Sequence, residues 1–241
     1  IPFVLVNGGK GIGTGFSYEC VPYNPSDIIK YIIEKLKNNN TNQFDFKPYY
    51  EGFKGTVIEL EPNKFLIKGK YENISHDTIK ITELPIGMWS ENYKEFLESL
   101  MVDRGKKKAI IKQYKDSCTD TVVDFTVKFH PNILPKLLSC KHNDNLYMIE
   151  KTMKLYTLKN NNLYLFNKDK KLKKYNNIST IIDDYMPVRY ECYEKRKKYQ
   201  LNQLDKNIIV LSNKARFIKE QCDNTIDLRR KKIDIVNKLL S

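Results

Sequence analysis

Five of the ten glycines in this 241-residue chain lie in one short run, residues 7–16, which also contains one isoleucine. Glycine lacks a Cβ atom, so such a run can adopt unusual backbone angles and bring its amides close to a partner. Ile12 lies between Gly11 and Gly13, and a bulky apolar side chain there suits a loop that presses onto a ligand. The same residues also fit a flexible loop after a buried strand.

The run does not match the common phosphate-binding loops. A Walker A loop ends in Gly-Lys-Ser/Thr, whereas Lys10 is followed by Gly11. The dinucleotide-binding pattern G-x-G-x-x-G does not match in any alignment of the run, because Thr14 and Phe16 occupy the positions of its last glycine. Nucleotide binding is therefore not predicted.

The charge of the chain favours a polyanionic partner. Lysine and arginine number 42 against 29 acidic residues, a net charge of +13. Many of the basic residues form three dense blocks: Arg104, Lys106, Lys107, Lys108, Lys112 and Lys115; Lys168, Lys170, Lys171, Lys173 and Lys174; and Lys195, Arg196, Lys197 and Lys198. A solvated surface is the alternative, but separated blocks are more typical of a discontinuous phosphate-binding surface. Nucleic acid is the leading class of partner.

Other features exclude function classes. No apolar run approaches the roughly 20 residues that span a bilayer, so no membrane is expected. The five cysteines are odd in number and lack a C-x-x-C pair, which favours an intracellular setting and argues against a disulfide framework or a zinc site. No metal ligands are predicted, and the three histidines are isolated. Because the chain opens on Ile1 rather than Met, we expect a fragment without a signal peptide.

Hydrophobic periodicity and turn residues predict the elements that position the glycine run. The predicted helices are 26–37, capped by Ser26, then 91–101 and 109–116. The predicted strands are 1–7, 55–60, 64–70, 78–84, 121–129 and two or three short ones within 154–175, with 160–162 as a turn. Glu61-Pro62-Asn63 predicts a tight hairpin.

The pattern changes after Ile178, where glycine disappears and a heptad seam begins. The seam residues are spaced alternately three and four apart: Leu201, Leu204, Ile208, Leu211, Ala215 and Ile218. About 33 helical residues form a rod of roughly 50 Å, which we expect to pair with a helix outside this chain. A further helix is expected at 228–240. The predicted fold class is α+β: a mixed α/β domain with short antiparallel sheets over 1–185, then a long helical arm over 186–241.

At this level of detail the chain resembles the type IIA DNA topoisomerases, in their eukaryotic and viral form. The shared blocks occur in the same order: Leu5–Gly15, Pro22–Pro25, Glu51–Thr56, Ile81–Pro85 with Trp89, Lys173–Tyr175, and Val188–Arg189 with Tyr193–Lys197. The resemblance covers nearly the whole chain. It implies the tower (linker) domain of the DNA gate and the start of the coiled-coil arm. A lysine replaces the glycine that usually precedes the Lys-Lys-Tyr block, which leaves the turn geometry there open.

The resemblance gives the glycine run a mechanism. By position, Ile12 is the residue that intercalates between base pairs and kinks the duplex. Further DNA-binding residues are expected in the glycine run and in the first basic block: Asn7, Lys10, Gly11, Gly13 and Thr14, with Lys106, Lys107 and Lys108.

The resemblance also implies what lies outside this chain. The parent enzyme is expected to be a homodimer that uses Mg²⁺ and ATP, with its nucleophilic tyrosine, metal site and ATPase upstream. No catalytic residue is therefore predicted here, and the chain alone is expected to be inactive. Arg189-Tyr190 imitates the catalytic dipeptide but falls at the junction with the arm. Nuclear or viral cytoplasmic localisation is expected.

Two alternatives remain open at this point. One is a non-enzymatic architectural protein that bends DNA, which an upstream reading frame without an Arg-Tyr and an acidic cluster would favour. The other is a coiled-coil adaptor that uses the 190–220 segment. That second alternative leaves the glycine run without a purpose.

Overall fold

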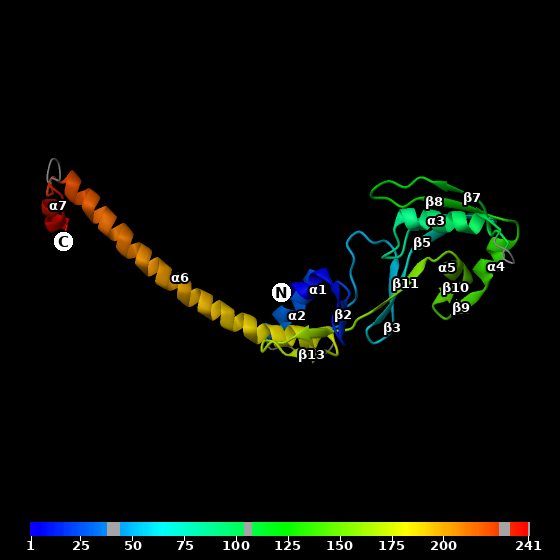
Figure 1. Cartoon of the computed structure of the whole chain (residues 1–241), viewed down its shortest axis with the longest axis horizontal. Helices are drawn as coiled ribbons and strands as arrows, with labels where there is room; N and C mark the ends of the chain where they lie inside the picture. The colour runs from blue at the N-terminus through cyan, green and yellow to red at the C-terminus, as the bar shows by residue number, and fades with distance from the viewer. Residues whose placement is uncertain (38–43, 104–107, 227–231, 241) are drawn as a thin grey trace. The chain divides into compact units, whose positions relative to one another are not determined.

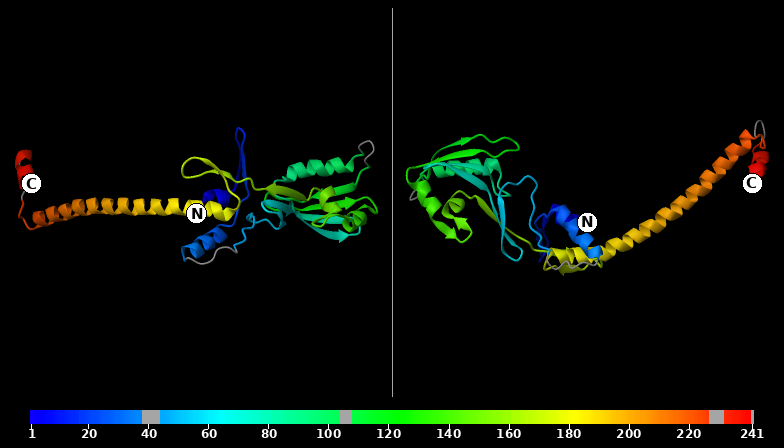
Figure 2. Two further views of the ribbon diagram at one scale, coloured as in Figure 1. Left: turned by 90° about the horizontal axis from the view of Figure 1, so that it is seen from below. Right: turned by 180° about the vertical axis from the view of Figure 1, so that it is seen from behind.

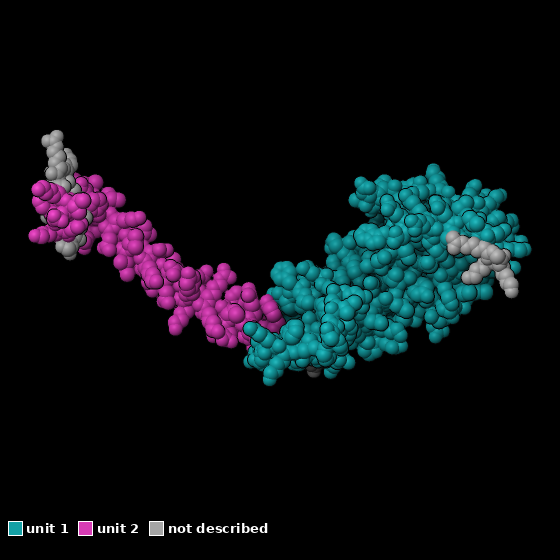
Figure 3. Space-filling view, in the orientation of Figure 1, with its two compact units in different colours: residues 1–182 teal, residues 183–241 magenta. Residues whose placement is uncertain are grey.

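A computed structural model describes residues 1–37, 44–103, 108–226 and 232–240 (Figure 1). The chain divides into two compact units, residues 1–182 and 183–241, which Figure 3 colours separately. The first unit contains short antiparallel sheets and several helices, and the second is helical. The predicted fold class, a mixed α/β body followed by a long helix, is confirmed.

The main core of the first unit lies against a four-stranded antiparallel sheet. Its strands follow the order β5 (Lys70–Ser75), β6 (Thr78–Glu83), β8 (Phe125–Phe129) and β7 (Ile111–Asp116). Phe125, Val127 and Phe129 of β8 are fully buried, as their alternation predicts. Helix α3 (Ser90–Met101) adds Tyr93 and Leu97 to this core. The predicted helix over 91–101 is confirmed, with Trp89 at the N-cap position and Ser90 as its first residue.

The predicted helix over 109–116 is wrong, because residues Ile111–Asp116 of this segment form β7. Ile111 lies opposite Phe129 and Asp116 lies opposite Phe125. The segment alternates only weakly, with one fully buried residue, so its local pattern does not distinguish a strand from a helix. The partner strand lies beyond it in the chain, and pairing with that strand decides the conformation.

A three-stranded antiparallel sheet connects the core to the N-terminal elements. Its order is β11 (Tyr156–Asn160), β4 (Lys64–Lys68) and β3 (Thr56–Glu61). The predicted β3–β4 hairpin is confirmed, and Asn63 adopts a left-handed φ of 67° in its turn. Strand β11 continues into the residues that hold the glycine-rich segment.

The extended conformation predicted for residues 1–7 is wrong. Residues Phe3–Asn7 form the short helix α1, in which Leu5 is completely buried. A short apolar run of this length does not distinguish a strand from a buried helical turn. Helix α2 (Pro25–Leu36) is confirmed, but its cap is Asn24 rather than Ser26. The Asn24 side-chain oxygen accepts a hydrogen bond of 2.9 Å from the Ser26 amide, which satisfies one free donor of the first turn.

The remaining elements of the first unit are short. They are the hairpin β1 (Gly9–Ile12) and β2 (Ser17–Cys20); α4 (Ile133–Ser139), β9 (Lys141–Asn143), β10 (Leu146–Tyr147) and α5 (Met148–Thr152); and the hairpin β12 (Tyr164–Phe166) and β13 (Leu172–Lys174). The strands expected within 154–175 are thus confirmed. Strand β8 is shorter than the predicted 121–129, because residues 121–124 precede its pairing with β6.

Helix α6 (Ile178–Cys222) is 45 residues long, because it starts well before the predicted seam and continues through Pro187. The six seam side chains are exposed within the described chain. Helix α7 (Ile233–Leu240) confirms part of the helix expected at 228–240, and residues 228–231 lie outside the described residues.

Candidate nucleic-acid interface

The glycine run forms a two-stranded antiparallel hairpin, which Figure 2 shows projecting from the first unit. Lys10 lies opposite Glu19, and Ile12 lies opposite Ser17. The turn closes with a 2.8 Å hydrogen bond from the Gly13 amide to the Phe16 carbonyl. Because successive side chains of a strand point to opposite faces, Lys10 and Ile12 share one face of β1.

Ile12 is at the loop end of this hairpin, and its exposed fraction is 84%. The Ile12 side chain is therefore not part of the core, as a side chain that inserts between base pairs requires. On the opposite face, Cys20 is buried and Tyr18 is half-buried. Burial raises the pKa of the Cys20 thiol to about 11, so this inner face is uncharged at neutral pH. The hairpin thus presents an apolar tip on one face and a neutral packing surface on the other.

Only some glycines of the run are required by the fold itself. Gly8 has a φ of +63°, and a Cβ there would lie 2.7 Å from the Cys20 carbonyl oxygen. A Cβ on Gly13 would make only an ordinary contact of 3.6 Å, and one on Gly11 would meet nothing within 4 Å. The chain therefore has no internal need for glycine at position 11. Its bare backbone is open to an external partner.

The polar site residues of the run are exposed but differ in their partners. Asn7 ends α1, and Thr14 lies in the turn between β1 and β2. Lys10 forms an ion pair of 3.6 Å with Glu19 across the hairpin. The Lys10 side chain is 66% exposed, and exposed pairs of this kind contribute at most about 1 kcal/mol, so an anion can compete for the ammonium group.

Of the three lysines predicted in the first basic block, the structure describes Lys108. Lys108 is exposed and precedes β7, at the edge of the four-stranded sheet. Lys106 and Lys107 lie outside the described residues. The described candidate residues are therefore those of the hairpin and α1, together with Lys108 before β7.

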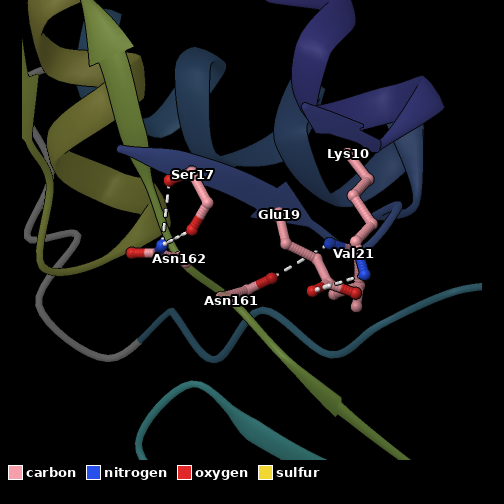
Figure 4. A network of polar contacts seen from close by, with 6 residues as sticks. All are labelled: Lys10, Ser17, Glu19, Val21, Asn161 and Asn162. Carbon is pink, nitrogen blue, oxygen red and sulfur yellow. Dashed lines mark hydrogen bonds and ion pairs between the residues drawn. The ribbon is translucent and has the colours of Figure 1, made fainter. Parts of the chain in front are cut away.

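Asparagines at 161 and 162 anchor the hairpin, although the sequence indicated only a turn there. Asn162 pairs with Glu19 through backbone hydrogen bonds of 3.0 and 2.7 Å, and its side chain donates to the Ser17 carbonyl at 2.8 Å (Figure 4). The Asn161 side chain accepts a 2.9 Å bond from the Val21 amide and donates a 2.6 Å bond to the Tyr23 hydroxyl. In an asparagine-rich chain no local signal separates such anchors from ordinary turn residues.

The Arg189-Tyr190 dipeptide lies on α6 and is exposed. The Arg189 guanidinium lies 4.5 Å from the ring centroid of Tyr193 and donates a 3.2 Å hydrogen bond to its hydroxyl. Arg189 thus contacts the tyrosine one helical turn on. Within the described residues, no group of three or more His, Cys, Asp or Glu side chains could hold a metal ion. None of the described helices has the length and apolarity to span a membrane.

Comparison with known proteins identifies the family. The model of the DNA gyrase/topoisomerase IV family, which describes the A-type subunit, matches residues 1–241. DNA topoisomerase 2 top-2 of Caenorhabditis elegans is 35% identical over 99% of this chain and 16% of its own length. DNA topoisomerase 2 of Acanthamoeba polyphaga mimivirus is 32% identical over 90% of this chain and 21% of its own length. The chain thus spans a small part of these relatives.

A solved structure agrees over the whole chain. The crystal structure of the Plasmodium falciparum topoisomerase II DNA-binding, cleavage and re-ligation domain is 33% identical, with a TM-score of 0.89. The match covers 100% of this chain and 32% of that one. Because the family model and the structural match both extend over the full length, this chain belongs to the type IIA DNA topoisomerase family.

Proposed function

We propose that this chain is the DNA-binding and DNA-bending segment of an ATP-dependent type II DNA topoisomerase. The parent enzyme passes one duplex through a transient double-strand break in another. In this proposal Ile12 inserts between base pairs and kinks the duplex. The observation that carries the proposal is an isoleucine, 84% exposed, at the end of a hairpin anchored to the rest of the first unit.

The energetics favour a localised wedge. Smoothly bending a 20–30 bp site costs on the order of 1–6 kcal/mol, and unstacking one base step costs a few kcal/mol. Contacts between the bent duplex and a basic surface offset this cost. The net charge of +13 favours such contacts, and the open backbone at Gly11 lets the duplex approach the hairpin closely.

We assign the remaining site residues to contacts with the phosphate backbone of the DNA. Asn7 and Thr14 are exposed polar groups beside the wedge, and Lys10 can exchange Glu19 for a phosphate. Phosphate contacts position a protein on DNA without selecting sequence. We assign the same role to Lys106, Lys107 and Lys108.

The domain assignment follows from the same proposal. Residues 1–185 are the tower domain, and residues 186–241 start the coiled-coil arm. The exposed seam from Leu201 to Ile218 supports this assignment, because burying a leucine or isoleucine contributes about 1.5–3 kcal/mol and a lone helix cannot do so. A helix outside this chain is the proposed partner of the seam, and the parent enzyme is proposed to be a homodimer.

Mg²⁺ and ATP are proposed to bind in other domains of the parent. The described residues do not fit a metal site, since they contain no suitable cluster of ligands. The nucleophilic tyrosine is likewise placed in another domain. The parent is proposed to act inside the cell, in the nucleus or, for a viral enzyme, in the cytoplasm.

The test is end-to-end FRET on a duplex of about 30 bp, titrated with the chain and with Ile12→Ala. We expect the variant to lose most of the bend while salt-dependent binding persists. Its free energy of unfolding should change by less than about 0.5 kcal/mol, because the side chain is exposed. Ile74→Ala is the matched control, since Ile74 is also exposed, at 57%, but lies in β5.

Equal bending by wild type and Ile12→Ala, measured with the upstream region of the parent attached, would refute the wedge. Neutralising Lys106, Lys107 and Lys108 together should lower the salt slope of binding by up to about three units. An unchanged slope would remove that block from the interface.

A further inference from the structure

The β12–β13 hairpin has the charge pattern of a second anion-binding element. Between Tyr164 and Tyr175 the only acidic residue is Asp169. The same segment contains five exposed lysines: Lys168, Lys170, Lys171, Lys173 and Lys174. Phe166, in the same hairpin, is 73% exposed. An apolar aromatic ring among lysines favours a partner that offers both phosphates and an apolar surface, as nucleic acid does.

The loop of this hairpin is ordered by its own hydrogen bonds. The Asn167 side chain accepts bonds from the amides of Asp169 and Lys171, at 3.0 and 2.9 Å. The Asn167 amide donates to the Lys171 carbonyl at 2.9 Å. The lysines are therefore presented by a defined turn.

Lys170 occupies a backbone conformation that favours glycine. Its φ is +59°, in the left-handed region, where a side chain with a Cβ is unfavourable. The turn itself would be more stable with glycine there. A lysine at this position lowers the stability of the fold and places a positive charge at the loop tip. Its presence there favours a role for Lys170 in binding rather than in folding.

The hairpin lies directly beside the one that carries Ile12. Glu19 and Asn162 form an antiparallel bridge, so β12 leads away from Asn162 toward the loop end of the β1–β2 hairpin. There the rings of Phe16 and Tyr164 are in contact, with centroids 5.4 Å apart. From Asn162 to Phe166 an extended strand covers about 13 Å, the length of roughly four base pairs of B-DNA.

We propose that the β12–β13 hairpin is a second DNA-contacting element, which binds the same duplex within a few base pairs of the Ile12 kink. Lys168, Lys170 and Lys171 contact phosphates, and Phe166 packs against the sugars or bases. This inference rests on the proposed function, because it takes the duplex at Ile12 as the ligand. In this arrangement the β1–β2 and β12–β13 hairpins contact the duplex on either side of the kink.

The experiment measures affinity by fluorescence anisotropy and bending by FRET, on the same duplex of about 30 bp and across a salt series. Each phosphate contact contributes about 0.9 to the slope of log affinity against log salt. Lys168→Gln combined with Lys171→Gln should therefore lower the slope by about 1.8. The control Lys141→Gln removes an exposed lysine of β9 and should leave the slope unchanged. Phe166→Ala should weaken binding by the same factor at every salt concentration.

Lys170 provides a test with effects of opposite sign. Lys170→Gly should raise the urea midpoint of unfolding and lower the DNA salt slope by about 0.9. Lys170→Asn tolerates the left-handed conformation and keeps the turn, so it should show the same loss of slope without added backbone freedom.

The outcomes separate this inference from the proposed function. If Ile12→Ala abolishes the bend while the lysine and Phe166 variants bind like wild type, the second element is refuted and the wedge stands. If the lysine variants lower the slope while Ile12→Ala still bends DNA, the hairpin binds DNA and the wedge fails. A Lys170→Gly chain that is more stable and binds DNA unchanged would refute the role assigned to Lys170.

Discussion

Replacing Asn161 with alanine tests whether this side chain holds the glycine-rich hairpin to the sheet. Its amide group joins three parts of the first unit. The side-chain oxygen accepts from the Val21 amide at 2.9 Å, just after β2. The side-chain nitrogen donates to the Tyr23 hydroxyl at 2.6 Å and approaches the Asn63 side chain at 3.4 Å. Asn161→Ala removes all of these contacts at once.

The magnitude follows from what the substitution leaves behind. Val21 and Tyr23 are 3% and 2% exposed, so two polar groups lose their partner in a buried place. A buried unsatisfied donor or acceptor costs about 1–3 kcal/mol. Because Asn161 is itself only partly buried, a water molecule can enter the space and recover part of the loss. The expected total is about 2–3 kcal/mol of unfolding free energy.

The assay is urea unfolding followed by circular dichroism at neutral pH. Burial raises the pKa of the Tyr23 phenol well above its usual range, so the hydroxyl stays neutral and titration does not interfere. Asn160→Ala is the control, because Asn160 is an exposed neighbour and its loss should cost less than about 0.5 kcal/mol. If Asn161→Ala loses less than about 1 kcal/mol, or no more than Asn160→Ala, the anchoring role is refuted.

Four further predictions use other features of the first unit. Gly8→Ala should destabilise the chain by about 1–3 kcal/mol, because φ is +63° and the new Cβ would lie 2.7 Å from a carbonyl oxygen. Gly11→Ala should leave the urea midpoint unchanged but weaken bending in FRET, and an equal loss of stability in both variants would contradict this. The hydrogen bond from Lys94, 2.6 Å between nitrogen and oxygen, lowers the pKa of Asp116 to about 2 from 3.8. A lowered pKa stabilises the fold above the ordinary value, and this contribution disappears as the pH falls from 3.8 toward 2. Asp116→Asn should therefore flatten the pH dependence of the urea midpoint in that window, and an unaltered dependence would count against the pair. Lys108→Gln should lower the salt slope of DNA binding by about 0.9, and an identical slope would place Lys108 off the duplex.

Local patterns in the sequence predicted the elements whose cause is local. The alternation of β8, the Pro62-Asn63 turn between β3 and β4, and the glycine-free stretch that becomes α6 all act within a few residues. The exposure of Ile12 agrees with the wedge role that the resemblance implies, because a side chain that inserts between base pairs cannot belong to the core. The order of the shared blocks was sufficient to indicate the family.

Tertiary contacts decided the rest. Residues 111–116 form a strand because β8 offers a partner, and in α1 a short apolar run that also fits a strand forms a helical turn with Leu5 buried. The anchoring by Asn161 and Asn162, and the contact of Phe16 with Tyr164, join residues about 140 positions apart or more. No pattern within one segment encodes such pairs, since a contact of this kind stabilises the fold only when both residues are in place. The sequence therefore determined which residue forms the exposed tip of the hairpin, and the tertiary structure determined what holds that hairpin and what lies beside it.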